Sequence, residues 1–117
     1  MPASSSPLHV RLPFSREDAV DPEEAFVAAL SSCHMLFVLA FAGKAGFVVD
    51  RYLDDAIGEM GRNEAGAEYV AAVTLRPTVS FAGEGPSAET LAELHHRAHA
   101  ACYLANSVRT AITIATT

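Results

Sequence analysis

Alternating apolar and polar positions predict strands in several parts of the chain. Residues 8–12, 69–81 and 107–116 follow a period of two, which is typical of half-buried strands. Residues 47–60 consist of short apolar runs broken by charges, and we interpret them as a further strand. The glycine-containing stretch 61–66 is the predicted turn that joins two of these strands into a hairpin.

A long apolar segment after the first strand predicts a helix from Pro22 to about Ala42. Asp21 can cap its N-terminus, a proline suits the first helical turn, and Glu24 can complete a capping box. Gly43 and the residues after it supply the stop. The local signals at both ends therefore define this helix well.

This helix is apolar on all sides. Residues 25–42 carry no formal charge and reach the lower length limit of a membrane span. Four residues in its middle, 31–34, are polar or reactive, so we expect no membrane insertion. A helix that is buried on all sides in so short a chain needs a second subunit to cover it. We therefore expect a homodimer.

A second helix is predicted to follow Ser87, which can cap it. Leu91, Leu94, Ala98 and Cys102 recur along it at helical spacing and form its apolar stripe. The order of elements is strand, helix, two strands, helix, strand. This order predicts one α+β domain over residues 1–117.

Composition and charge restrict the function. Half of the 117 residues are apolar, as in globular domains, and the formal net charge is −6. Because no cluster of Lys and Arg is present, neither nucleic acid nor an anionic membrane surface is an expected partner. Residues 1–10 lack the pattern of a secretory signal, so we expect a cytoplasmic protein. In that compartment a pair of cysteines is more often reduced, catalytic or redox-sensing than a structural disulfide.

The two cysteines are the strongest candidates for chemistry. Cys33 lies near the centre of the first predicted helix and Cys102 near the end of the second, so the helices can pack them against each other. Free cysteines are often only small buried apolar residues. However, Ser31, Ser32 and His34 surround Cys33 in an otherwise apolar run, and buried polar groups need partners. These neighbours predict a small polar site centred on Cys33, although His34 by itself is equally typical of an interior histidine.

Three histidines before Cys102 allow a second hypothesis. His95 and His99 lie one helical turn apart, and Cys102 follows on the same side. Such a set could bind zinc, with Cys33 as a fourth ligand. No CxxC or HExxH motif supports it, and we predict no metal site. On the simpler interpretation, His95 and His96 are partly exposed and His99 packs near the core.

Glu23 could reach the site only from another chain. It lies ten residues before Cys33, which is about 15 Å along a helix axis, so the two side chains cannot meet within one subunit. Either Glu23 serves the site of a partner subunit, or it only complements the positive end of its own helix.

Two segments resemble a known family. Residues 21–33, DPEEAFVAALSSC, are similar to the helix of the first cysteine in the OsmC/Ohr family, whose pattern is NPE(E/Q)L-xAAxxxxC. Residues 98–108, AHAACYLANSV, resemble its second-cysteine segment, AHxxCxxxNS. The similarity extends over about residues 21–115 and is closer to OsmC-like members than to the dedicated Ohr enzymes.

The resemblance implies an intertwined homodimer in which two central helices are wrapped by antiparallel β-sheets. It also implies a thiol peroxidase that reduces hydroperoxides, organic ones especially, and we expect no cofactor. By position, Cys33 attacks the peroxide and becomes a sulfenic acid, and Cys102 resolves it as a disulfide. A small dithiol or a redox protein then reduces that disulfide. Glu23 matches the glutamate of the motif, which serves the partner subunit's site.

One part of the family pattern has no clear match. Family members carry a catalytic arginine on an N-terminal strand, and only Arg11 and Arg16 are candidates for it upstream of Glu23. Protonated His34 is a further candidate for the cation, because a thiol in the middle of a helix gains little from the helix dipole. If none of these groups stabilises the Cys33 thiolate, the chain is a non-catalytic OsmC-like protein that binds a small ligand or senses oxidation.

Overall fold

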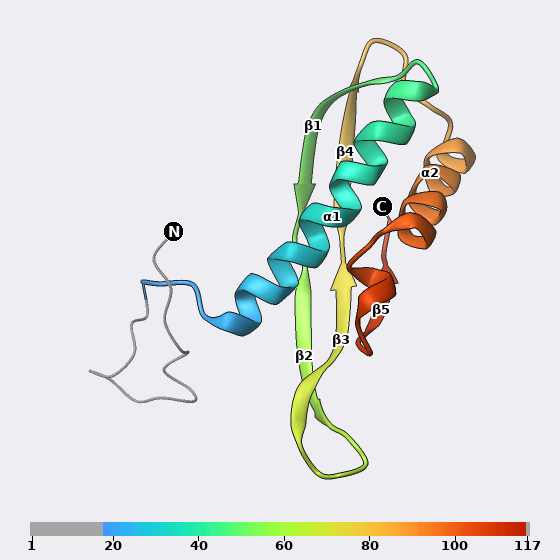
Figure 1. The fold of residues 1–117 in the computed structure, drawn as a ribbon. Helices are drawn as coiled ribbons and strands as arrows, with labels where there is room; N and C mark the ends of the chain where they lie inside the picture. Colours follow the sequence, from blue (N-terminus) through green and yellow to red (C-terminus); the bar gives the residue numbers. More distant parts are fainter. Residues whose placement is uncertain (1–17, 117) are drawn as a thin grey trace.

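The computed structural model describes residues 18–116, in which two helices pack beside a long ribbon of strands (Figure 1). This arrangement confirms the predicted α+β class. In chain order the elements are α1 (Pro22–Lys44), β1 (Val48–Asp54), β2 (Ile57–Arg62), β3 (Glu68–Leu75), β4 (Pro77–Ala82), α2 (Ala88–Ala101), the 3-10 helix η1 (Ala105–Ser107) and β5 (Ala111–Ile114).

The strands form two sheets that follow each other along the ribbon. β1 pairs antiparallel with β4, whereas β2 pairs antiparallel with β3, and β5 adds to β3 in parallel. β2 continues the direction of β1, and β4 continues that of β3 (Figure 1). The predicted strands 47–60 and 69–81 are therefore each two strands, and both break at the same level of the ribbon.

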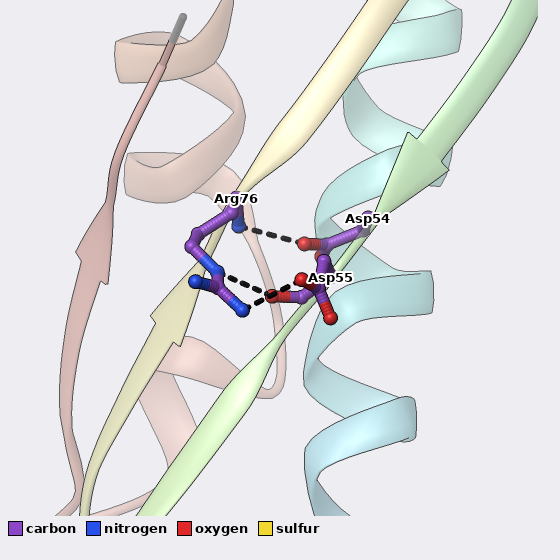
Figure 2. Close-up of polar contacts among 3 residues, drawn as sticks. All are labelled: Asp54, Asp55 and Arg76. Carbon is purple, nitrogen blue, oxygen red and sulfur yellow. Dashed lines mark hydrogen bonds and ion pairs between the residues drawn. The ribbon is translucent and has the colours of Figure 1, made fainter.

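Side chains explain why the ribbon breaks there (Figure 2). The Asp54 carboxylate accepts the backbone N–H of Arg76 at 2.7 Å, so a side chain takes a donor that would otherwise pair with a strand. The Arg76 guanidinium donates to the backbone carbonyl and to the carboxylate of Asp55, both at 2.7 Å. The other oxygen of Asp54 accepts the hydroxyl of Ser31 at 2.5 Å, which ties the junction to α1 close to Cys33.

The C-terminal strand is shorter than predicted. β5 covers only Ala111–Ile114 of the expected 107–116: Ser107 belongs to η1, and residues 108–110 form an irregular connection between η1 and the strand. β5 lies parallel to β3, and β4 and α2 together form the crossover that a parallel pair requires. The predicted strand 8–12 lies outside the described residues.

α1 begins as predicted. The Asp21 carboxylate accepts the backbone N–H of Glu24 at 2.8 Å, and the Glu24 carboxylate accepts that of Asp21 at 3.3 Å, which completes the capping box. The helix continues to Lys44, slightly beyond the predicted end near Ala42. Gly46, whose φ of +89° suits glycine, then turns the chain into β1.

α1 packs against both α2 and the ribbon. Buried apolar side chains of the described residues come from both helices and from β3, and include Leu30, Val38, Ala42, Val73, Leu75, Leu94 and Ala98. Gly58 on β2 allows the close approach of α1, since a Cβ at this position would lie 2.7 Å from Cγ2 of Val27. α1 therefore lies close to the ribbon along the half of the helix that precedes Cys33.

Much apolar surface remains uncovered within one chain. Leu36 on α1 is 61 % exposed, and the other exposed large apolar side chains are Val48, Leu53, Ile57, Met60, Tyr103 and Leu104. The radius of gyration is 16.4 Å, compared with about 13 Å for a compact domain of this length. An elongated chain with this much exposed apolar surface has the features of a subunit that packs against a partner.

The described residues contain one helix, α1, that could cross a membrane by its length and apolar composition. Its stripe Leu30, His34, Val38 and Ala42 is instead buried against other parts of the chain. A core helix of a globular protein meets the same criteria of length and composition.

Candidate functional site

The two cysteines meet between the helices. Cys33 comes from the middle of α1, Cys102 directly follows the last residue of α2, and their sulfur atoms lie 2.8 Å apart. Both are free thiols, of which Cys33 is half-buried and Cys102 is 1 % exposed. The prediction that the helices bring the cysteines together is confirmed. A reachable thiol beside a buried one can be oxidised in two steps to a disulfide.

The turn after α2 holds Cys102 in place. The Asn106 side-chain amide donates to the backbone carbonyls of Ala100 and Cys102, at 3.0 and 2.9 Å. The Ser107 hydroxyl donates to the carbonyl of Tyr103 at 2.7 Å. These side chains, visible in the sequence only as part of a motif, satisfy carbonyl groups that the end of the helix leaves without partners.

The surroundings of Cys102 favour its protonated form. Burial raises the pKa of the Cys102 thiol, and the hydrogen bond with Cys33 raises it further. Backbone groups of Leu104 and Ala105 oppose this shift with smaller effects. Because the thiolate is the nucleophile, Cys102 must lose its proton before or while it attacks another sulfur.

Within residues 18–116, the polar neighbours of Cys33 in the sequence do not gather around its thiol. The Ser31 hydroxyl binds Asp54, Ser32 is exposed, and His34 turns to the opposite helix. Neighbouring residues of a helix point in different directions, so three polar side chains next to one another in sequence reach three separate surroundings.

His34 instead forms a buried pair with His95 of α2. Nε2 of His34 lies 2.9 Å from Nδ1 of His95, and the two residues are 1 % and 3 % exposed. The expectation that His95 is partly exposed is therefore wrong, because this hydrogen bond satisfies it within the core. Burial first, and then His95 and His99, lower the pKa of His34 to about 4. Burial also lowers the pKa of His95, against an opposing effect of Asp54.

These pKa shifts bear on the cation that a thiolate needs. His34 is uncharged at pH 7, so it does not supply the positive charge expected beside Cys33. Within residues 18–116, the sulfur of Cys33 has one hydrogen-bond partner, the sulfur of Cys102. The other candidates, Arg11 and Arg16, lie outside the described residues.

The remaining histidines differ in exposure. His96 is exposed, whereas His99 is half-buried and faces the inner gap that Cys102 borders. In the described part of the chain, no group of three or more histidine, cysteine or acidic side chains is placed to hold a metal ion. The alternative zinc site therefore has no ligand set there.

Glu23 lies away from the cysteines. It is in the first turn of α1 and lines an open groove of about 590 Å³ between that helix and β2. Ten helical residues, or about 15 Å along the axis, separate it from Cys33. One chain alone therefore does not bring Glu23 to the dithiol.

Comparison with known proteins adds a family to this geometry. A family model described as OsmC-like protein matches residues 15–117. An OsmC-like protein of unknown function from Vibrio cholerae is 48 % identical, with a TM-score of 0.94, over 98 % of this chain and 75 % of that chain. A comparison with curated protein sequences finds no significant match.

More distant solved structures share the fold. The organic hydroperoxide resistance protein OhrB of Bacillus subtilis is 18 % identical, with a TM-score of 0.71, over 86 % of this chain and 73 % of that chain. The organic hydroperoxide resistance protein OsmC of Legionella pneumophila is 15 % identical, with a TM-score of 0.76, over 97 % of this chain and 78 % of that chain. At these identities the likeness shows the arrangement of elements and no more.

Proposed function

Because the chain belongs to the OsmC-like protein family, we propose that it is a thiol-dependent peroxidase that reduces organic hydroperoxides. The observation that carries this proposal is the 2.8 Å separation of the Cys33 and Cys102 sulfur atoms. Thiols this close need only a short approach of their sulfur atoms to join as a disulfide. The names of the Bacillus subtilis and Legionella pneumophila proteins support the substrate class.

The proposed reaction uses the two cysteines in turn. The Cys33 thiolate attacks one peroxide oxygen, the O–O bond breaks, an alcohol leaves and Cys33 becomes a sulfenic acid. The Cys102 sulfur then attacks the Cys33 sulfur, so that a disulfide forms and the hydroxyl group leaves as water. A small dithiol or a redox protein restores both thiols by exchange, and we place the protein in the cytoplasm, where such reductants are present.

The Cys33 thiolate requires a nearby cation, and we propose that a residue upstream of α1 supplies it. Arg11 or Arg16 would supply the positive charge that no described residue offers to Cys33. A carboxylate can hold a guanidinium in one orientation, and Glu23 of the partner subunit is proposed for this role. A homodimer that covers the exposed face of α1 around Leu36 would bring these groups together.

Aromatic side chains beside the dithiol support an organic substrate. Phe37 lies one helical turn after Cys33, and Tyr103 follows Cys102. Their rings meet edge to face with centroids 5.1 Å apart. Covering this apolar surface favours an alkyl or aryl peroxide, whereas hydrogen peroxide has no apolar group to bury.

A second function is favoured by one observation, the lack of a cationic partner for Cys33 among the described residues. Without such a partner, the same dithiol would sense oxidation or border a site for a small ligand, with no turnover. The 48 % identical Vibrio cholerae protein is of unknown function and favours neither alternative.

Peroxide consumption by the reduced protein distinguishes the two functions. We expect rapid loss of cumene hydroperoxide, slower loss of hydrogen peroxide, and neither in the Cys33→Ser variant. The Cys102→Ser variant should still consume one equivalent of peroxide and then stop, because the sulfenic acid cannot be resolved. With a small dithiol present to allow turnover, consumption that stops after one equivalent would leave oxidation sensing, and no consumption above the Cys33→Ser background would leave only ligand binding.

A further inference from the structure

The chain leaves the hydrogen-bond ladder of α2 at Cys102. This residue is extended, with φ −60° and ψ 117°, and its backbone N–H reaches the His99 carbonyl only at 3.4 Å. Regular structure resumes at Ala105, where η1 begins. The helix itself therefore does not fix the carbonyl side of Cys102, and contacts from beyond the helix hold its main chain.

The Asn106 side-chain amide supplies two of these contacts. Its nitrogen donates to the carbonyls of Ala100 and Cys102, at 3.0 and 2.9 Å, and the backbone N–H of Asn106 donates to the same Cys102 carbonyl at 3.1 Å. A short neutral side chain offers two donors from one atom only if it ends in an amide. Because both partners are carbonyl oxygens, which never donate, the amide nitrogen and not its oxygen faces them. Asn106 thus joins the last turn of α2 to Cys102.

The main chain of Cys102 decides where its sulfur lies. The sulfur is 2.8 Å from that of Cys33, and a disulfide requires about 2.05 Å. A gap too small for a water molecule borders the Cys102 side chain, and its lining includes Leu75, Ala105 and Ile112. This gap gives the sulfur room to move away from Cys33 once the main chain is released. Packing alone therefore does not secure the contact between the two sulfur atoms.

The same turn directs backbone groups at the Cys102 sulfur. Burial and the hydrogen bond with Cys33 raise the pKa of this thiol, and the backbone groups of Ala105 and Leu104 oppose them. The hydrogen bond from the Asn106 backbone to the Cys102 carbonyl closes the turn that contains both groups. Fixing this turn therefore also keeps in place the groups that stabilise negative charge on the Cys102 sulfur as it attacks.

We propose that Asn106 is a positioning residue, which holds the Cys102 thiol against Cys33 and so decides whether the Cys33 sulfenic acid closes to the disulfide or is oxidised further. The inference rests on the proposed peroxidase function, because that reaction forms the sulfenic acid. Asn106 acts through the main chain of Cys102 and takes no part in making or breaking bonds.

Two reactions compete for the sulfenic acid. In the first, the Cys102 sulfur attacks the Cys33 sulfur, the S–O bond breaks, and the hydroxyl leaves as water with the thiol proton, which Cys102 already donates towards Cys33. In the second, another hydroperoxide transfers one oxygen to the Cys33 sulfur, its O–O bond breaks, an alcohol leaves and Cys33 becomes a sulfinic acid. Thiols do not reduce a sulfinic acid. Only the first reaction depends on the position of Cys102, so a displaced Cys102 leads to inactivation.

A single-turnover experiment measures the resolving step. Reduced protein is mixed with one equivalent of cumene hydroperoxide, quenched rapidly in acid and alkylated, and the states of Cys33 are counted by peptide mass spectrometry. Asn106→Asp keeps the shape of the side chain without its N–H donors, and Asn106→Leu removes the donors without adding a charge. We expect both variants to form the sulfenic acid at the wild-type rate. The disulfide should form at least about 10-fold more slowly, since a misplacement of ~1 Å can cost about 100-fold in rate.

Ser87→Ala is the control for a loss of stability. The Ser87 hydroxyl accepts the backbone N–H of Thr90 at 3.1 Å and caps the opposite end of α2. Its removal destabilises the same helix far from Cys102. We expect this variant to form the disulfide at the wild-type rate. With excess peroxide and a dithiol, sulfinic acid on Cys33 should accumulate over successive turnovers in the Asn106 variants and not in this control.

A thiol–disulfide equilibrium tests the positioning without peroxide. The protein is equilibrated with mixtures of glutathione and its disulfide, and the fraction that contains the Cys33–Cys102 bond is measured. A thiol that is already held in place loses less freedom when the bond forms, so we expect a weaker disulfide in the Asn106 variants. A tenfold fall in the equilibrium constant corresponds to a reduction potential about 30 mV less negative.

Two outcomes would overturn the positioning role. One is disulfide formation at the wild-type rate in folded Asn106→Asp and Asn106→Leu. The other is equal slowing in Ser87→Ala, because the stability of α2, and not the Asn106 amide, would then explain the loss. If the wild-type protein forms no sulfenic acid, it is the proposed peroxidase function that fails, and an unchanged glutathione equilibrium in the Asn106 variants would then separately refute the role of Asn106.

Discussion

Burial decides what His34 can do. Its position directly after Cys33 predicts a positive charge beside the thiol, yet the ring lies in the core and pairs with His95. Removing an ionisable group from water disfavours its charged form, and the neighbouring His95 and His99 act in the same direction. At this position the residue is therefore uncharged at pH 7 and does not stabilise a thiolate.

The low pKa of His34 makes stability depend on pH. The pKa of His34 is 6.5 in the unfolded chain, as for an ordinary histidine, and about 4 in the folded protein. Between pH 4 and 6.5, therefore, mainly the unfolded chain binds a proton at this residue. We expect the free energy of unfolding to fall as the pH drops from about 6.5 to 4, by on the order of 3 kcal/mol from His34. His95, with its lowered pKa, adds to the same fall.

Urea unfolding at a series of pH values measures this effect. In His34→Gln the free energy of unfolding should change less over the same pH range, although the variant is less stable at neutral pH. Parallel pH dependences of the wild-type protein and His34→Gln would show that His34 titrates normally in the folded state.

Individual elements depend on contacts that lie far apart in the sequence. Asp54 at the end of β1 takes the backbone N–H of Arg76 and the hydroxyl of Ser31, and so fixes both the break of the ribbon and its position against α1 (Figure 2). The side chain of Asp55, the next residue, forms only an exposed ion pair with Arg76. Two adjacent carboxylates thus have unequal structural importance.

This difference predicts unequal costs of substitution. Asp54→Ala removes two partly buried hydrogen bonds to a carboxylate, and we expect a loss of about 2–3 kcal/mol in the free energy of unfolding. Asp55→Ala removes an ion pair whose carboxylate is 87 % exposed, and a loss below about 1 kcal/mol is expected. Both values come from urea unfolding at pH 7. Similar costs for the two variants would refute the assigned role of Asp54.

The whole molecule has the surface of a subunit. Its elongated shape leaves one side of α1 exposed, and Glu23 and Cys33 lie too far apart along that helix to meet in one chain. A second copy against this side would bury the apolar residues and could place its own Glu23 near the dithiol. The proposed site is therefore incomplete without the partner.

Light scattering during size-exclusion chromatography tests the dimer. We expect a mass of about twice the 12.4 kDa of the chain. Leu36→Glu places a charge on the exposed apolar face of α1, and it should shift the protein towards the monomer because burying that charge is costly. Ala65→Glu, in the exposed turn between β2 and β3, is the matched control and should keep the wild-type mass. A monomeric wild-type protein would contradict both the dimer and the role of Glu23.

Features that depend on a few neighbouring residues could be predicted from the sequence alone. The capping box of Asp21 and Glu24, and the cap of α2 by Ser87, each involve residues three positions apart and form as expected. The alternation of residues 69–75 predicts a strand for the same reason, since every second side chain faces the same side. The meeting of Cys33 and Cys102 was also predicted, because each cysteine belongs to one of two helices that could pack against each other.

Only the tertiary structure decided the features that join distant residues. His34 and His95 are 61 positions apart, and no local pattern shows that the second ring is buried against the first. The break of both long strands depends on Asp54 and Arg76, which are 22 positions apart, so alternation continues across it in the sequence. Hydrophobic periodicity reports which side of an element is apolar, whereas the partner on that side, and the protonation state it imposes, follow from how the elements pack.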